Sequence, residues 1–248
     1  MIHYNHLRII DMKLNPIPNE EWEKKYKLLM LDPYLAKKYN REKRLKDHRK
    51  YMNNCTPEIM RCTGKSILEI GPGMGEYLEL CRDYGHNAFG IDAVITDNEM
   101  GSEYAQMSKL MTERQGLNVL YTGFDRYLKM NIEYRQGVIP NMSVFYINMR
   151  GCIEQCFKEY MTGPPHKETK DCSKLSWHIT PELWEMFELM FAEFDRILVD
   201  GGYVYCWANG SANNPEYDNL WLVTLKKFPQ FQLFKKVGKL QHKIRKVL

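Results

Sequence analysis

Apolar and polar positions along this chain follow two periods. Short apolar runs, typical of buried strands, alternate with stretches in which apolar residues recur every three or four positions, as in amphipathic helices. The apolar runs predict strands at residues 66–70, 88–91, 118–121, 143–148 and 203–207, with a final strand pair at the C-terminus. The helical stretches cover residues 76–84, 103–114, 152–161, 180–196 and 220–228. This alternation predicts an α/β fold with a mostly parallel, seven-stranded sheet and helices on both faces.

The N-terminal part of the chain has a different pattern. Residues 19–53 are strongly charged, and apolar residues such as Trp22, Tyr26 and Leu29 recur at helical spacing. We therefore expect one or two amphipathic helices, and we divide the chain into an N-terminal helical extension or lid, residues 1–60, and a main domain, residues 61–248. Residues 163–179 lack periodicity, as binding loops often do.

Composition narrows the class of protein. The chain of 248 residues has room for one large α/β domain with an appendage. It contains no apolar run of about 18 residues and no secretory pattern at its N-terminus, which predicts a cytoplasmic protein without a membrane span. The cysteines are odd in number and scattered, which favours buried thiols over disulfides. Cys152 and Cys156 have no nearby histidine, so we expect no metal site.

The formal net charge of +4 comes from two basic segments, residues 37–50 and 235–246. Such segments are more often solvated helix faces or tails than phosphate-binding surfaces, although the second interpretation stays open. Nucleic acid is thus a possible partner but not the favoured one.

The most informative stretch is Ser66–Gly75, an apolar strand followed by Gly71, Gly73 and Gly75. A dinucleotide-binding loop would need its third glycine at position 76, which is Glu76. A pyrophosphate also favours backbone donors without nearby negative charge, whereas Glu69 and Glu76 flank this turn. The acidic residues suit a cation, such as the ammonium and sulfonium groups of S-adenosylmethionine.

A second motif follows at Gly90-Ile91-Asp92, where Asp92 ends the second predicted strand 17 residues after Gly75. A carboxylate at this place can accept hydrogen bonds from both ribose hydroxyls of a nucleoside. The alternative is that Asp92 only caps the next helix.

These two motifs resemble the first two motifs of class I S-adenosylmethionine-dependent methyltransferases. Arg196-Ile197-Leu198 followed by Gly201-Gly202 resembles the turn before that family's fifth strand, so the resemblance covers about residues 66–207. It implies a Rossmann-like, doubly wound fold and an enzyme that converts S-adenosyl-L-methionine to S-adenosyl-L-homocysteine.

The resemblance also implies a cofactor site. Glu69 and the three glycines would surround the methionine half, Asp92 would hold the ribose, and Asp125 would hold the adenine amine. Residues after the fourth strand would face the sulfonium. The implied set is Glu69, Gly71, Pro72, Gly73, Met74, Gly75, Asp92, Ala93, Asp125, Asn148, Met149 and Arg150.

A general base is needed only when the acceptor is a hydroxyl or a protonated amine. The candidates are His178 and His166, in the segment without periodicity, and Glu154, on the helix predicted after the fourth strand. The alternative for each is an ordinary polar residue in a loop or at the surface.

The acceptor is constrained by two motifs that the chain lacks. The position after the fourth strand reads Ile147-Asn148-Met149-Arg150 in place of the Asn/Asp-Pro-Pro-Tyr/Phe of DNA amine methyltransferases, and no Pro-Cys offers a nucleophile for cytosine C5. We expect a small-molecule or glycan acceptor, methylated at a hydroxyl. The alternatives are an RNA- or protein-modifying enzyme that docks through its basic ends, and a non-catalytic cofactor-binding protein. The oligomeric state stays open.

Overall fold

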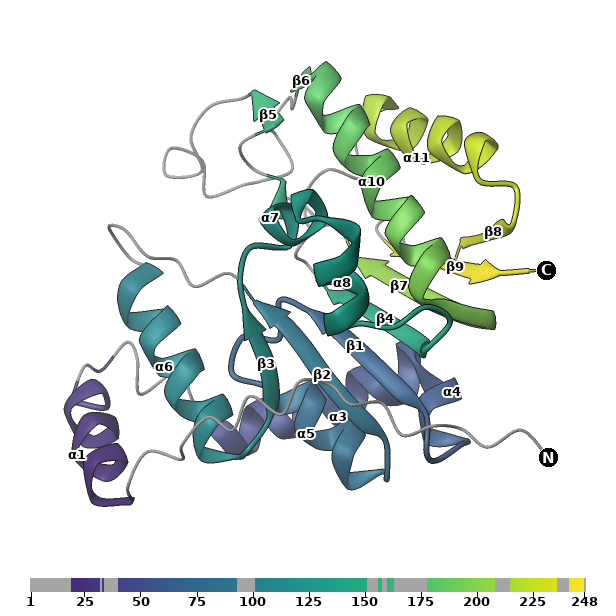
Figure 1. Ribbon diagram of the computed structural model, residues 1–248. Helices are drawn as coiled ribbons and strands as arrows, with labels where there is room; N and C mark the ends of the chain where they lie inside the picture. The colour runs from purple at the N-terminus through teal and green to yellow at the C-terminus, as the bar shows by residue number, and fades with distance from the viewer. Residues whose placement is uncertain are drawn as a thin grey trace. The chain divides into compact units, whose positions relative to one another are not determined.

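A computed structural model of the chain describes residues 19–31, 33, 40–92, 101–150, 156–157, 160–162, 178–207, 215–235 and 241–247 (Figure 1). The chain forms two compact units. We call residues 12–123 the N-terminal unit, and residues 124–248 together with residues 1–11 the C-terminal unit.

The N-terminal unit alternates helices with three parallel strands, in the order β3-β2-β1. Its elements are α1 (Asn19–Leu29), α3 (Arg41–Cys55), α4 (Pro57–Met60), β1 (Ser66–Ile70), α5 (Glu76–Asp83), β2 (Asn87–Asp92), α6 (Gly101–Arg114) and β3 (Asn118–Tyr121). Ile67, Leu68 and Ile70 of β1 are all buried, as expected for a parallel strand covered on both faces. The predicted strand at 66–70 is confirmed to the residue.

The C-terminal unit contains the other four main strands, in the order β4-β7-β9-β8. Its elements are α7 (Phe124–Lys129), α8 (Ile132–Val138), β4 (Val144–Arg150), β5 (Met161–Thr162), β6 (His178–Ile179), α10 (Pro181–Ile197), β7 (Leu198–Trp207), α11 (Pro215–Lys227), β8 (Phe231–Lys235) and β9 (Gln241–Lys246). Strands β4 and β7 are parallel, whereas β9 is antiparallel to both β7 and β8. The predicted final strand pair is confirmed, as is the mostly parallel, Rossmann-like α/β class.

Strand β7 continues through Gly201 and Gly202 by means of a β-bulge. Val144 pairs with Leu198 and Tyr146 with Tyr203, so β7 bulges between these two pairs. Gly201 lies in the bulge at φ +76°, a conformation that residues with a Cβ rarely adopt. The strand predicted to follow a glycine turn therefore begins earlier, at Leu198.

Helix α10 carries the aromatic core of the C-terminal unit. The Thr180 side chain accepts a hydrogen bond from the Leu183 N–H, which confirms the predicted N-cap, and Pro181 occupies the first turn. Phe187 and Phe191 are fully buried and meet the Trp221 ring edge to face, at centroid distances of 5.4 and 5.6 Å.

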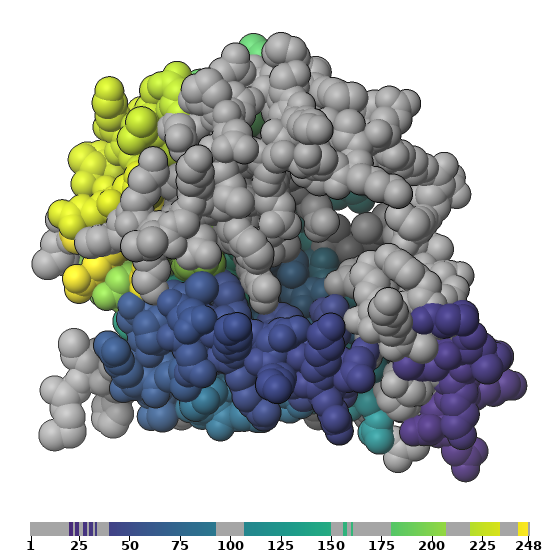
Figure 2. Space-filling model, turned by 180° about the vertical axis from the view of Figure 1, so that it is seen from behind, coloured from purple at the N-terminus to yellow at the C-terminus, as the bar shows by residue number. Residues whose placement is uncertain are grey.

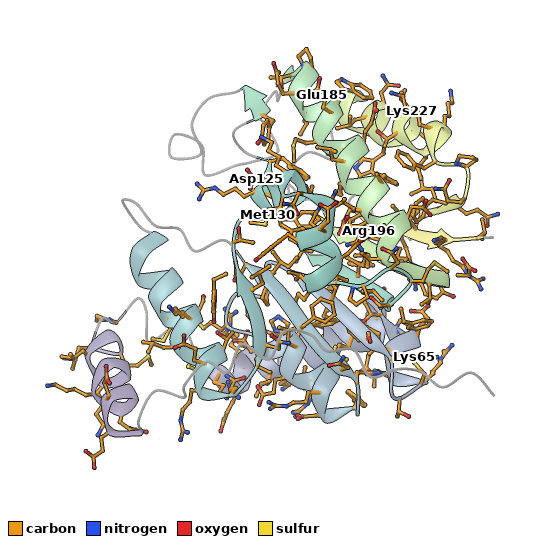
Figure 3. The ribbon with its side chains drawn as sticks, viewed as in Figure 1. Lys65, Asp125, Met130, Glu185, Arg196 and Lys227 are labelled. Atoms are coloured by element: carbon orange, nitrogen blue, oxygen red, sulfur yellow. The ribbon has the colours of Figure 1, made fainter. Side chains whose placement is uncertain are left out.

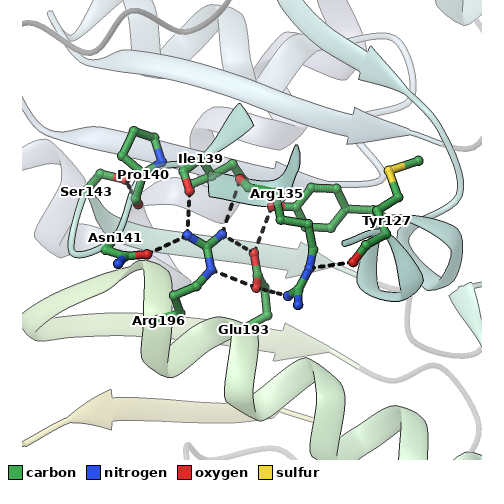
Figure 4. A network of polar contacts seen from close by, with 9 residues as sticks. Tyr127, Arg135, Ile139, Pro140, Asn141, Ser143, Glu193 and Arg196 are labelled. Carbon is green, nitrogen blue, oxygen red and sulfur yellow. Dashed lines mark hydrogen bonds and ion pairs between the residues drawn. The ribbon is translucent and has the colours of Figure 1, made fainter. Parts of the chain in front are cut away.

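The polar side of α10 is a buried network centred on Glu193 (Figure 4). Its carboxylate accepts a hydrogen bond of 2.8 Å from the Tyr127 hydroxyl and forms ion pairs with Arg135 and Arg196. Burial, and then the charge of Glu193, raise the pKa of Tyr127, so its hydroxyl stays protonated and donates. Arg196 also donates to the Ile139 carbonyl at 2.7 Å. The network joins α7, α8 and α10, and it gives Arg196 a structural role.

Three predictions need correction. Asn148, Met149 and Arg150 belong to β4 and do not follow it. Met161 does not end a helix, because its backbone pairs with Ile179 in the β5–β6 pair; most of the predicted helix at 152–161 lies outside the described residues. Helices α4, α7 and α8 were not predicted.

Two further findings concern membrane-spanning helices and the cysteines. Among the described residues, no helix is both long and apolar enough to cross a bilayer. The cysteines described, at positions 55, 62, 81, 156 and 206, form no disulfide with one another, and burial raises the pKa of Cys81 well above its usual value.

Candidate cofactor site

The loop between β1 and α5 has a backbone that only glycines adopt readily. Gly71, Gly73 and Gly75 have φ angles of +73°, +56° and +80°, in the left-handed region that is strained for residues with a Cβ. Each glycine of the sequence motif is thus required by the backbone itself. The residues between the glycines, Pro72 and Met74, are buried.

Close packing adds a second requirement for glycine. A Cβ on Gly75 would lie 2.4 Å from the Leu117 side chain, and a Cβ on Gly90 would lie 2.7 Å from the Pro72 ring. Gly90 belongs to the second motif, in β2, so the two motifs meet through Pro72. The contact explains why the residue before Ile91 and Asp92 is a glycine.

Hydrogen bonds tie the loop to the end of β2. The Gly71 N–H donates to the Ile91 carbonyl at 2.8 Å, and the Gly73 N–H donates to Oδ2 of Asp92 at 3.0 Å. The Asp92 side chain is partly exposed. The structure therefore brings together the glycine loop and the carboxylate that the sequence assigns to a ribose.

The carboxylates around the loop differ in their partners. Glu69 is buried in β1, immediately before the loop. Glu76, the first residue of α5, is buried against Arg44 of α3: the guanidinium pairs with both carboxylate oxygens, Nη2 to Oε2 at 3.2 Å. The sequence predicts that Glu76 contributes negative charge to the turn, but Arg44 neutralises that charge. Glu69 and Asp92 are two further carboxylates beside the loop among the described residues.

Tyr121 is a neighbour of Asp92 that the sequence analysis missed. It pairs with Asp92 in the β2–β3 ladder, and its hydroxyl is hydrogen-bonded to the Thr112 hydroxyl of α6. Burial raises its pKa to about 12, and the Thr112 bond offsets part of that rise. The sequence contained a signal for this contact. In a parallel sheet, the residue that ends the third strand lies beside the residue that ends the second.

In the C-terminal unit, Asp125 lies in the first turn of α7 (Figure 3). Its Oδ2 atom is 3.4 Å from the Tyr160 hydroxyl, which also accepts a hydrogen bond of 2.6 Å from Lys129. Asn148 and Met149 are fully buried in β4, and Arg150 is the last residue of that strand.

The residues predicted for catalysis are largely outside the described part of the chain. Glu154 and His166 lie outside it, as does Ala93 of the predicted cofactor set. The His178 backbone lies in β6, opposite Thr162, so it is paired in a short ladder at the edge of the segment predicted to be a loop.

Comparison with known proteins gives remote likenesses only. Neither a protein-family model nor a curated protein matches this sequence. A SAM-dependent methyltransferase from Aquifex aeolicus aligns at 17% identity and a TM-score of 0.46, over 86% of this chain and 97% of its own. One from Archaeoglobus fulgidus aligns at 19% identity and a TM-score of 0.42, over 80% of this chain and 75% of its own.

The geometry limits what this site can bind. The loop has no side chain at Gly71, Gly73 and Gly75, and two carboxylates, Glu69 and Asp92, lie next to it. Such a site suits a ligand that combines positive charge with hydroxyls to be held by a carboxylate.

Proposed function

We propose that the protein is an S-adenosylmethionine-dependent methyltransferase whose cofactor is held by the β1–α5 loop. Gly71, Gly73 and Gly75 would receive the methionine half beside Glu69, and Asp92 would hold the ribose. The observation that carries the proposal is the hydrogen bond from the Gly73 N–H to Asp92 at 3.0 Å. It joins the two motifs into one site with a carboxylate at its centre.

The buried Glu69 favours this ligand over a dinucleotide. A diphosphate binds where the backbone donors of a helix N-terminus meet no negative charge. In the first turn of α5 the charges of Glu76 and Glu79 are paired with Arg44 and Arg41, so the discrimination falls to Glu69. The buried Glu69 would add repulsion to a phosphate, whereas it would attract an ammonium group.

The proposed cofactor supplies a methyl group that its sulfonium has already activated. What the chain must do is hold donor and acceptor in line, since orientation accounts for much of the acceleration in such displacements. Asp92 and the loop would fix the donor. We propose His178, His166 or Glu154 as the group that takes the proton from a hydroxyl acceptor. Asp125 is proposed for the adenine amine, and residues 148–150 for the neighbourhood of the sulfonium.

For the acceptor we propose a small molecule or a glycan, and the ion pairs of the basic segments support this choice. Arg41 and Arg44 are paired with Glu79 and Glu76, and Lys246 is paired with Asp195 at 3.1 Å and is almost fully buried. These three cations are engaged within the fold, so only part of the basic charge, such as the exposed Lys46 and Arg49 of α3, is open for docking. An RNA-directed enzyme would have to dock through that remainder.

Calorimetric titration with S-adenosylmethionine, S-adenosylhomocysteine and NAD tests the cofactor. We expect the first two to bind and NAD not to bind; a preference for NAD would overturn the proposal. A labelled-methyl screen of cell extract, separated into metabolite, glycan, RNA and protein fractions, tests the acceptor. Label in the RNA or protein fraction would favour the alternative acceptors, and tight binding without transfer to any fraction would indicate a non-catalytic protein.

A further inference from the structure

Helix α3 contacts α5 through two matched ion pairs. Arg41 and Arg44 are three residues apart on α3, and Glu79 and Glu76 are three residues apart on α5. The Arg41 guanidinium lies 2.6 Å from both oxygens of Glu79, and Arg44 pairs with Glu76. The described residues of α3 and of the segment that follows it are blue in Figure 2. Because residues three apart share a helix face, the two faces match in charge.

The Arg44–Glu76 pair is the more buried of the two. The Glu76 side chain is 1% exposed and that of Arg44 24%, so water screens their interaction weakly. Glu76 is also fixed relative to the glycine loop. It follows Gly75 directly, and the Gly75 N–H donates to the Pro72 carbonyl at 3.0 Å. A change in charge at Glu76 therefore acts on the loop from a fixed position.

The charge at this position matters differently for the two forms of the proposed cofactor. S-adenosylmethionine carries a sulfonium, whereas S-adenosylhomocysteine has a neutral sulfur. Both forms carry the same ammonium group, so negative charge near the loop distinguishes them through the sulfonium, and this part of the stabilisation is lost as the methyl group leaves. An unpaired carboxylate at Glu76 would hold the donor more tightly in the ground state than in the transition state, which opposes catalysis.

We propose that Arg44, by neutralising Glu76, sets the electrostatic potential at the glycine loop and so determines how strongly the protein discriminates between methyl donor and demethylated product. Arg44 is a positioning and specificity residue supplied by the N-terminal helices, and it acts on the cofactor site through Glu76. The inference rests on the proposed function. It gives Arg44, a residue of the basic segment 37–50, a role at the cofactor site in place of a role in surface charge.

The test compares dissociation constants for S-adenosylmethionine and S-adenosylhomocysteine by calorimetry, and it needs no acceptor. In Arg44→Gln the unpaired Glu76 should favour the sulfonium, so the ratio of the product constant to the donor constant should rise about threefold. In Glu76→Gln the positive charge of Arg44 is no longer balanced by Glu76 and should lower that ratio by about the same factor. The double variant should return it to the wild-type value. Lys46→Gln, an exposed cation of the same helix, should leave the ratio unchanged.

A purely structural role would weaken both ligands equally and leave the ratio constant, which would overturn the inference. If Arg44→Gln does not fold, as judged by circular dichroism, the nearly isosteric Glu76→Gln decides alone, and an unchanged ratio there contradicts us. Failure of the proposed function would look different, because the wild-type protein would then bind neither ligand.

Discussion

The backbone N–H of Gly73 donates a hydrogen bond to Oδ2 of Asp92, across 3.0 Å and 19 positions of sequence. The donor belongs to a loop with a left-handed backbone, and the acceptor ends the neighbouring strand. Asp92 thus has a structural task in addition to the ribose contact proposed for it. The two tasks can be separated experimentally, since an amide keeps an acceptor oxygen but loses the charge.

Replacing Asp92 tests the cofactor site. We expect Asp92→Ala to weaken S-adenosylhomocysteine binding at least about tenfold, because charge-assisted hydrogen bonds to the ribose are lost. Asp92→Asn should weaken binding less, while keeping the Gly73 hydrogen bond. Calorimetry measures both, and Asp83→Ala, at an exposed site of α5, is the control. Equal affinity in Asp92→Ala and wild type would remove Asp92 from the site.

Two glycine substitutions should act in opposite directions. Gly75→Ala should destabilise the protein by about 2 kcal/mol or more, because it strains a positive φ and overpacks against Leu117. Gly137 lies within helix α8, and an added Cβ there meets no atom within 4 Å. Gly137→Ala should therefore stabilise by about 0.5–1 kcal/mol. Urea unfolding measures both, and the same sign for the two changes would refute the steric explanation.

We expect that removing the Glu193 carboxylate from its buried network causes a large loss of stability. Glu193→Ala leaves Arg135 and Arg196 without the buried carboxylate they share, and we expect a cost of about 3–5 kcal/mol. Glu185→Ala, on the exposed side of the same helix, should change stability by less than about 0.5 kcal/mol. Chemical denaturation gives both values. A small effect at Glu193 would mean that the cluster in Figure 4 adds little to the fold.

The raised pKa of Tyr121 predicts that the protein loses stability in alkali. Its pKa is about 12 in the folded protein and near 10 in the unfolded chain, so the unfolded state loses its proton first. The contribution of Tyr121 to stability is therefore constant below pH 10 and falls between pH 10 and 12. In Tyr121→Phe, the free energy of unfolding should fall less steeply over that range.

The control for this titration is Tyr134→Phe, which alters an exposed ring. Urea unfolding at a series of pH values should give the wild-type slope for Tyr134→Phe. A wild-type slope for Tyr121→Phe as well would show that Tyr121 does not titrate late.

The sequence predicts this fold best where one physical requirement dominates. Strands β1 and β3 are confirmed to the residue, because continuous apolar runs bounded by polar or glycine residues allow few alternatives. Helices α7 and α8 were missed because they are short and close to one another, with too few turns to show a period. Strand β4 continues past the predicted end at Asn148 through the buried Met149 to Arg150.

The candidate site was predicted in part for the same reason. The glycines of the loop are visible in the sequence because no other residue tolerates their backbone. The neutralisation of Glu76 was not visible, since its partner Arg44 lies 32 positions earlier and spacing along the chain does not indicate that contact. Charge near a site can be counted from the sequence, but its pairing is set by tertiary packing.

The short β5–β6 pair described above has a consequence for engineering. Met161 and Thr162 pair with Ile179 and His178, and the Thr180 hydroxyl donates to the Tyr160 carbonyl at 2.7 Å. The chain on either side of residues 163–177 is thus joined independently of what lies between. Since the entropy of closing a loop grows only slowly with its length, inserting residues between positions 163 and 177 should change the stability of the fold little, and a loss of activity would then be attributable to the interrupted segment and its His166.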